Sequence, residues 1–267
     1  MTDRFKSAEH VVDSSGRPYH IGVGPGDVAP SILLVGDPAR AERCAKRFDQ
    51  LQGSWQNREF TTFTGSLSDT QITVMATGIG CDNTEIAIIE LAQIVENATI
   101  IRAGTCGAVD PHLKLGELVV TWGAVRLEST STTFVPEGYP AVAHPRVIQA
   151  LTDAVEGAGS TWKLGMTATA CGFYGAQARK IDRFPPRQPN LIEDLAQIGV
   201  LNLEMETSTL LTLASLAGFQ AGAVCTVFSE RAANRFVKSG DKQRFEDRAV
   251  DAALKALISL APTSTTE

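Results

Sequence analysis

The feature that most constrains the fold is a regular alternation of short apolar runs, rich in β-branched residues, with longer helix-like segments. Several runs are nearly continuous in apolar character, as is typical of strands covered on both faces. This order predicts an α/β protein, a three-layer α/β/α sandwich around a mixed, largely parallel sheet. The predicted strands span residues 31–36, 72–78, 99–104, 118–127, 163–171, 200–203 and 221–228. The predicted helices span residues 38–48, 82–95, 144–158, 191–198, 207–217 and 244–260.

Local signals refine these boundaries. Asp82 and Glu85 have the spacing of a capping box at a helix start, and Gly199 and Gly218 stand where C-terminal caps are expected. A further strand-like segment rich in threonine follows Phe60. Two of the five cysteines, Cys171 and Cys225, fit core positions within apolar runs.

Length and composition indicate a single globular domain over residues 1–267, with residues 1–18 as an N-terminal extension and residues 262–267 as a frayed tail. A hydrophobic content of 43% is ample for a large core. We see no internal repeat and no linker that would divide the chain.

The charge balance argues against a polyanionic partner. The 24 Lys and Arg against 30 Asp and Glu give a net charge of -6, with no block of like charge that would bind nucleic acid or a membrane surface. No apolar run approaches the roughly 20 residues that span a bilayer, and the charged start does not resemble a signal peptide. Five scattered cysteines fit reduced thiols, so we expect a cytoplasmic protein.

Residues 203–207 place Glu204 and Glu206 on either side of Met205. At the strand period of two, both carboxylates can face one side while methionine offers an apolar surface, a combination that suits the hydroxyls and the apolar face of a ribose. Two surface acids at a strand end are the simpler interpretation of this segment by itself, because glutamates are usually exposed.

Three separated arginines suggest an anion site. Residues 36–40 follow a predicted strand with a glycine, a proline at a helix start and then Arg40, which together could cradle an anion. Arg102 lies inside an apolar strand and needs either a protein carboxylate or a bound anion as its partner. Arg58 could simply pair with Glu59 at the surface. Guanidinium groups match phosphate oxygens in bidentate fashion, so phosphate would suit the three together.

Nucleotide-cofactor motifs are absent. Residues 78–80 lack the third glycine of the dinucleotide fingerprint, residues 22–24 follow no convincing strand, and there is no Walker A sequence.

In order along nearly the whole chain, from residue 19 to residue 260, short motifs resemble the uridine phosphorylase branch of the nucleoside phosphorylase superfamily. Each motif is short, and the joint order makes the resemblance specific. The motifs are Gly36-Asp37-Pro38 with Arg40, Asn57-Arg58-Glu59-Phe60, Ala76-Thr77-Gly78-Ile79-Gly80, Arg102-Ala103-Gly104-Thr105, Phe173-Tyr174-Gly175-Ala176-Gln177-Ala178-Arg179 and Glu204-Met205-Glu206.

The resemblance implies a distorted central sheet and reversible phosphorolysis of a nucleoside, with inorganic phosphate as co-substrate and no cofactor. It implies that phosphate is bound by Gly36, Arg40, Arg58, Arg102 and Thr105, with Arg58 supplied by a neighbouring subunit. It implies that the base is bound by Phe173, Gln177, Arg179, Phe228 and Arg231. The ribose would be held by Glu204, Met205, Glu206 and, from across a dimer, His20. The catalytic residues would be Arg102, Gln177, Arg179 and Glu206.

The chain departs from the family pattern at several positions. Ala176 stands where a glycine is common and could narrow the base pocket. Cys171 and Gly172 replace residues that could bond the base, and Cys106 replaces a hydroxyl residue. Glu230 falls where the purine branch uses an aspartate at the base.

We expect no resident metal. Some relatives hold a monovalent cation at the dimer interface, and the corresponding positions here are Glu59, Ile79 and Asn83, of which the asparagine is a departure.

The sequence therefore predicts a homo-oligomeric uridine phosphorylase-like pentosyltransferase of nucleoside salvage, a hexamer assembled from dimers. Its partners would be a nucleoside, phosphate and further copies of the same chain, without nucleic acid or membrane. The alternatives are a purine nucleoside phosphorylase, a hydrolytic nucleosidase, which has no need of three phosphate-facing arginines, and a non-catalytic nucleoside-binding protein on the same scaffold.

Overall fold

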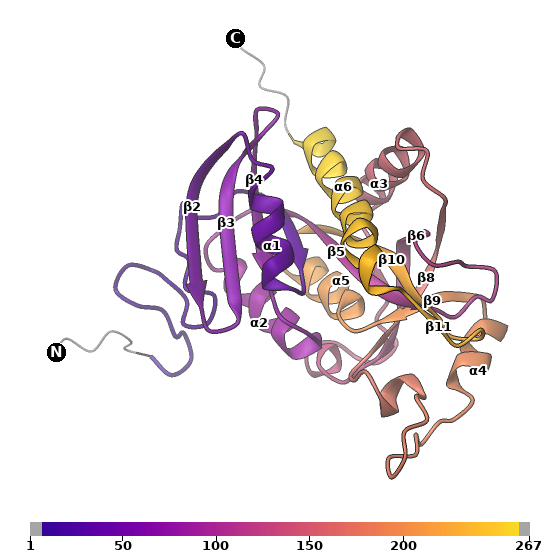
Figure 1. The fold of residues 1–267 in the computed structure, drawn as a ribbon. Coiled ribbons are helices and arrows are strands. Elements are labelled where there is room, and N and C mark those ends of the chain that lie inside the picture. Colours follow the sequence, from indigo (N-terminus) through magenta and orange to yellow (C-terminus); the bar gives the residue numbers. More distant parts are fainter. Residues whose placement is uncertain (1–6, 262–267) are drawn as a thin grey trace.

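The predicted alternation of strands and helices is present in the computed structural model, which describes residues 7–261 (Figure 1). Its strands are β1 (Ser31–Val35), β2 (Gln50–Asn57), β3 (Phe60–Leu67), β4 (Thr70–Ala76), β5 (Thr99–Ala108), β6 (Leu118–Leu127), β7 (Ala141–Val142), β8 (Trp162–Ala170), β9 (Val200–Glu204), β10 (Gln220–Glu230) and β11 (Arg235–Phe236). Its helices are α1 (Pro38–Ala45), α2 (Cys81–Leu91), α3 (Pro145–Gly157), α4 (Leu191–Gln197), α5 (Thr207–Leu216) and α6 (Lys242–Leu260). All seven strands and six helices predicted by residue range are present, the threonine-rich segment after Phe60 forms β3, and β2, β7 and β11 are additional.

Within residues 7–261 the strands form one eleven-stranded sheet in the order β11-β10-β6-β8-β9-β5-β1-β4-β3-β2, with β7 beside β6. An extra parallel pairing of β10 with β5 closes five strands, β5, β10, β6, β8 and β9, into a ring. This closure is the distortion expected of the sheet. Antiparallel pairings are more numerous than predicted, since β2, β3 and β4 form an antiparallel edge and β10 runs antiparallel to β6.

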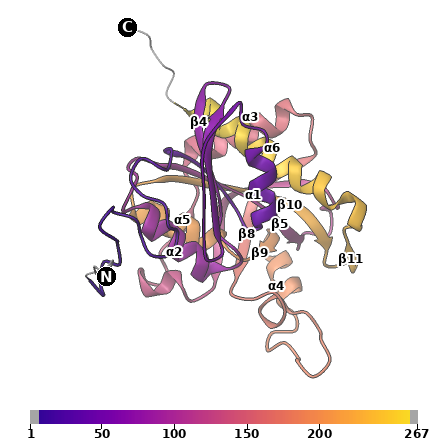
Figure 2. The same ribbon diagram turned by 60° about the vertical axis from the view of Figure 1, so that its left-hand side comes forward.

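The helices cover both faces of the sheet (Figure 2). On β1, Leu33 and Val35 belong to one apolar cluster with α1, α3 and α6, whereas Ile32 and Leu34 belong to the other with α2 and α5. Every residue of β1 is buried. A continuous apolar run is therefore needed here, because successive side chains enter opposite layers and both layers are dry.

The predicted C-terminal caps of two helices are confirmed, and the predicted N-terminal capping box of one helix is wrong. Gly199 and Gly218 have left-handed φ values of 79° and 71° just after α4 and α5, as their capping role requires. The capping box at Asp82 is wrong, because α2 begins at Cys81 with Gly80 as its N-cap and no side-chain cap. Asp82 instead accepts a hydrogen bond from Thr130.

Cys225 is buried as predicted, whereas Cys171 is exposed because it lies one residue beyond the end of β8. In the predicted N-terminal extension, Val12 pairs with Pro18 in an isolated bridge. The predicted tail at residues 262–267 lies outside the described residues.

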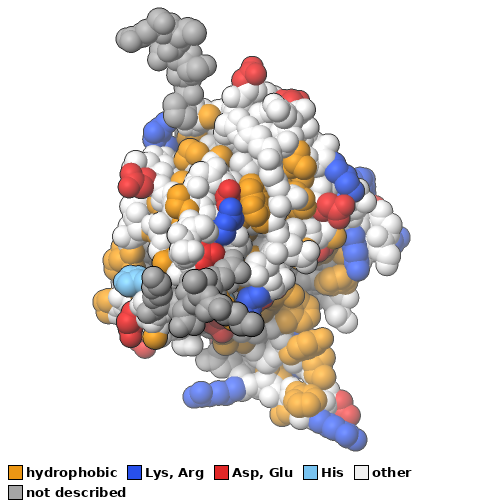
Figure 3. All heavy atoms as spheres, turned by 90° about the vertical axis from the view of Figure 1, so that its left-hand side faces the viewer, with side chains coloured by type: hydrophobic (Ala, Val, Ile, Leu, Met, Phe, Trp, Pro, Cys, Tyr) orange, Lys and Arg blue, Asp and Glu red, His pale blue; other side chains and the backbone are white. Residues whose placement is uncertain are grey.

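Among residues 7–261, no helix has the length and apolar character needed to cross a bilayer. On the face shown in Figure 3, acidic and basic side chains are interspersed, without a field of one sign.

Candidate active site

A cavity of about 840 Å³ opens where several strands end. Residues within three positions of the ends of β1, β4, β8 and β9, namely Gly36, Gly78, Phe173 and Met205, contribute to its lining, as the rule for open α/β sheets anticipates. Strand β5 is different, because it runs on to Ala108 and lines the cavity with residues inside the strand. The predicted end of this strand at residue 104 is too early, since its pairing with β10 continues around the ring.

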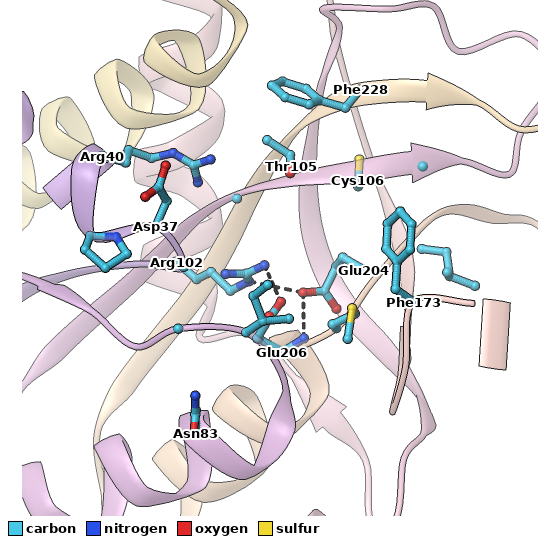
Figure 4. A pocket seen from close by; sticks show the side chains of 18 of the residues that line it. Asp37, Arg40, Asn83, Arg102, Thr105, Cys106, Phe173, Glu204, Glu206 and Phe228 are labelled. Atoms are coloured by element: carbon cyan, nitrogen blue, oxygen red, sulfur yellow. Dashed lines mark hydrogen bonds and ion pairs between the residues drawn. The ribbon is translucent and has the colours of Figure 1, made fainter. Parts of the chain in front are cut away.

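One end of the cavity collects the residues predicted to bind an anion. Gly36 and Arg40 come from the β1–α1 junction, and Arg102 and Thr105 come from β5. Both arginines are buried, at 7% and 6% exposure, although they are separated by 62 positions in the chain. In the view of Figure 4 they lie on one side of the cavity, opposite Phe173 and Phe228. Two buried guanidinium groups beside one cavity can bind an oxyanion.

Arg102 forms a buried ion-pair network with the two glutamates of the 203–207 segment. Its Nε donates to Glu204 Oε2 at 3.1 Å, and its Nη2 donates to Glu206 Oε2 at 2.5 Å. Gly104 makes this arrangement possible, because a Cβ at that position would lie 2.8 Å from Arg102 Nη2. Arg102 therefore has protein carboxylates as partners, one of the two possibilities considered from the sequence, and it also lines the cavity where an anion could bind.

The two glutamates differ in how much hydrogen-bonding capacity the protein uses. Glu204 accepts hydrogen bonds from Thr169 Oγ1 at 2.6 Å, from the amides of Glu206 and Thr207, and from Arg102. Its side chain is only 1% exposed. Since an ionised carboxylate has about four lone-pair sites, Glu204 has little capacity left for a ligand.

Among residues 7–261, the Glu206 carboxylate accepts hydrogen bonds from Arg102 and from the Gly80 amide at 2.7 Å, so its oxygens have more lone pairs available than those of Glu204. Burial raises the pKa of Glu206, and neighbouring Glu204 raises it further, while Arg102 opposes the shift. The ion pairs outweigh burial for Arg102 itself and raise its pKa. The arrangement thus keeps a permanent cation at the anion end and a carboxylate beside it.

The other end of the cavity contains Phe173, Gln177 and Arg179 from the loop that follows β8. Arg179 Nε donates to the Phe173 carbonyl at 2.9 Å, and the guanidinium carbon lies 3.9 Å from the centre of the Phe173 ring. Gln177 is buried and Arg179 is half-buried, and burial lowers the pKa of the arginine. An aromatic face with an amide and a guanidinium beside it can stack and hydrogen-bond a planar heterocycle.

Arg231 lies behind this loop, outside the lining of the cavity. Its Nη2 donates to the backbone carbonyl of Gln177 at 2.8 Å, so it supports the loop from behind. Burial, with the charge of Arg179 nearby, lowers the pKa of Arg231 to about 10. The resemblance implies that Arg231 contacts the base directly, whereas in this structure Arg231 contacts the backbone of Gln177 and does not line the cavity.

Strand β10 supplies Phe228 and Ser229 to the cavity, and β11 supplies Phe236. Consecutive residues of a regular strand point to opposite faces, but a β-bulge interrupts the register with β5 between Val227 and Ser229. Phe228 and Ser229 can both line the cavity because of this bulge.

Glu230 points to a different place. It accepts from the Leu115 amide at 3.2 Å, pairs with Arg235, and lines a smaller cavity of about 220 Å³. Burial raises its pKa, but Arg235 and the Leu115 amide outweigh this effect and lower it overall. Glu230, which stands where the purine branch uses an aspartate, therefore does not line the larger cavity.

His20 does not line the cavity of its own chain. Its Nδ1 contacts Glu90 at 2.6 Å, and its ring packs edge-on against Tyr19. Arg58, at the cavity rim, lies 5.8 Å above the same Tyr19 ring. The two residues that the resemblance assigns to a neighbouring subunit's site therefore share one surface cluster.

The three positions that correspond to a cation site, Glu59, Ile79 and Asn83, also line the cavity. Within residues 7–261, no group of three or more His, Cys, Asp or Glu side chains is arranged to hold a metal ion.

Two of the sequence departures have no effect on the lining within the described residues. Ala176 packs against the apolar cluster around α4 rather than narrowing the cavity, and Cys171 does not reach it. Cys106 does line the cavity, but burial raises the pKa of its thiol well above normal, so it remains neutral. Ser229 and Phe236 were not foreseen, and only the general excess of aromatic residues in ligand sites could have pointed to Phe236.

Comparison with known proteins shows the family to which the chain belongs. Residues 30–261 match the family model described as the phosphorylase superfamily. The chain belongs to this superfamily. It is 43% identical to a uridine phosphorylase of Thermococcus kodakarensis over 245 residues, which cover 91% of this chain and 88% of the relative. It is also 31% identical to a guanosine phosphorylase of Halorubrum lacusprofundi, with 89% and 94% of the two chains covered.

Among solved structures, it resembles a Trypanosoma brucei nucleoside phosphorylase described as showing uridine phosphorylase activity. The TM-score is 0.88 and the identity 27%, and the match covers 93% of this chain and 99% of the other. These matches support the resemblance and the fold.

Proposed function

We propose that this superfamily member is a uridine phosphorylase, a pentosyltransferase that converts uridine and phosphate to uracil and ribose 1-phosphate. The observation that carries the proposal is one cavity lined by buried Arg40 and Arg102 at one end, Glu206 in the middle, and Gln177 and Arg179 at the other. An oxyanion, a sugar and a base can occupy these positions in that order.

In the proposed reaction a phosphate oxygen forms a bond to C1′ as the bond from C1′ to the base nitrogen breaks. The electron pair of the broken bond goes to the base, which takes a proton from solvent. Arg40 and Arg102 position the phosphate, and Glu206 accepts hydrogen bonds from the ribose hydroxyls. Gln177 and Arg179 stabilise the negative charge that develops on the uracil, and donors of this kind typically contribute about 10²–10³ in rate.

The second candidate function is that of a purine nucleoside phosphorylase, because the chain is also similar to a guanosine phosphorylase. The orientation of Glu230 away from the cavity favours uridine, because no acid of β10 then faces the base.

The test is a phosphate-dependent assay that compares uridine with inosine. We expect uracil release that requires phosphate and exceeds inosine cleavage at least tenfold. Faster inosine cleavage would favour the purine reaction, and turnover that survives phosphate removal would favour a hydrolase. Uridine binding without uracil release at any phosphate concentration would identify a non-catalytic protein.

The proposal includes assembly. We infer that dimers form the working unit, that a hexamer is built from them, and that the enzyme works in the cytoplasm without a cofactor. The joint position of His20 and Arg58 beside Tyr19 supports a shared site, since one approaching neighbour could receive both.

A further inference from the structure

Arg40 is held by a carboxylate that belongs to the opposite end of the chain. Glu246, in the first turns of α6, places its Oε1 2.9 Å from Arg40 Nη2, and its Oε2 contacts Arg43. The Glu246 side chain is 14% exposed and lies outside the cavity lining. The carboxylate therefore acts on the cavity only through the arginine.

The other contacts of Arg40 are weak. Its Nη1 reaches the Ala103 carbonyl at a long 3.3 Å, and its Nε is buried without a partner among the described residues. A free arginine side chain samples many rotamers, and ordering it when an anion binds would cost affinity. A contact that fixes the guanidinium beforehand removes that cost.

The charges around Glu246 leave Arg40 attractive to an anion. One carboxylate is shared by two guanidinium groups, so the trio of Arg40, Arg43 and Glu246 carries a net charge of +1. Arg43 competes for the same carboxylate and prevents Glu246 from neutralising Arg40 completely.

We propose that Glu246 is a positioning residue that holds the Arg40 guanidinium in the orientation that binds phosphate. This proposal rests on the proposed function of the cavity. It couples the docking of α6 against α1 to the phosphate-binding end.

A purely structural role for Glu246 as a tether between α1 and α6 can be separated by a neighbour. Asp247 of α6 pairs at 3.1 Å with Arg47, which lies two residues beyond the end of α1 and also contacts Asp251, and Arg47 does not line the cavity. Asp247→Asn therefore removes one of the two ion pairs that link Arg47 to α6, and it leaves the partners of Arg40 in place.

The experiment compares wild type, Glu246→Gln and Asp247→Asn with phosphate varied at saturating uridine and with uridine varied at saturating phosphate. We expect Glu246→Gln to raise the phosphate KM about tenfold and to change the uridine KM less than twofold. Asp247→Asn should change both less than twofold. An unchanged phosphate KM in Glu246→Gln, equal rises in both KM values, or the same phosphate effect in Asp247→Asn would overturn the proposal.

Two further measurements test the role of Glu246 if Glu246→Gln does not fold or if wild type does not cleave uridine. If Glu246→Gln does not fold, Glu246→Asp keeps the charge but shortens the reach, and it should also raise the phosphate KM selectively; a normal value would contradict the positioning role. If wild type does not cleave uridine, calorimetric titration with inorganic phosphate still tests Glu246. Binding weakened about tenfold by Glu246→Gln supports the role even though the proposed function has failed, and equal binding refutes it.

Discussion

Arg102 Nη2 lies 2.5 Å from Glu206 Oε2, and this ion pair joins the arginines of the cavity to its carboxylates. Replacing Arg102 with alanine should raise the phosphate KM and lower kcat/KM by about 10²–10³, because both binding and alignment of the attacking oxygen depend on it. It should also cost about 3–5 kcal/mol of stability by leaving two buried glutamates without their cation. Steady-state kinetics and denaturant unfolding measure these effects. Arg102→Lys serves as the control, since it keeps the charge without the fork and should recover stability more than rate.

The raised pKa of Glu206 predicts an acid limit for activity. The ionised carboxylate accepts the ribose hydroxyls in our proposal, so activity should fall as pH decreases through a pKa that lies above the usual range for glutamate. The profile of log kcat/KM against pH should show this limb in wild type and lose it in Glu206→Gln. If the same acid limb remains in the profile of Glu206→Gln, a group other than Glu206 causes the loss of activity at low pH.

Glu204 should influence the cavity without touching the ribose, because its oxygens are already occupied within the protein. The ratio of kcat/KM for uridine to that for 2′-deoxyuridine should stay within twofold of wild type in Glu204→Gln, even if overall activity falls. In Glu206→Gln, the matched control, the ratio should drop at least tenfold. A comparable drop in Glu204→Gln would restore Glu204 as a direct ribose ligand.

The proposed sharing of a site between two subunits predicts complementation. Arg58→Ala lacks the donated arginine and Arg102→Ala lacks the receiving one, so each variant alone should have low activity. When the two are co-expressed in equal amounts, half of the dimers are mixed and each mixed dimer has one complete site, which gives about a quarter of wild-type activity. Activity no higher than that of the separate variants would indicate that Arg58 serves its own chain.

The sequence predicted the buried strands because both faces of these strands are covered, which makes them continuously apolar. Strand β2 was not predicted because it is a mostly exposed edge strand without a continuous apolar run. Strand β11 was not predicted because two residues are too few to show a periodic pattern. Arg40 and Arg102 could be predicted since each stands in a recognisable local motif. Glu246 could not, because it meets Arg40 only through the packing of segments far apart in the chain, and Phe236 could not, because the short strand that pairs it with Ser229 has no pattern of its own.

The bulge at Phe228 has an evolutionary consequence. Substituting Glu230 with aspartate would alter the smaller cavity and leave the base untouched, however well the new side chain matched a purine. Deleting a single residue between Thr226 and Glu230 would reverse which faces the following side chains occupy and turn an acid toward the substrate. On the proposed function, an acid from this part of β10 would thus reach the base through an indel rather than through a point mutation at Glu230.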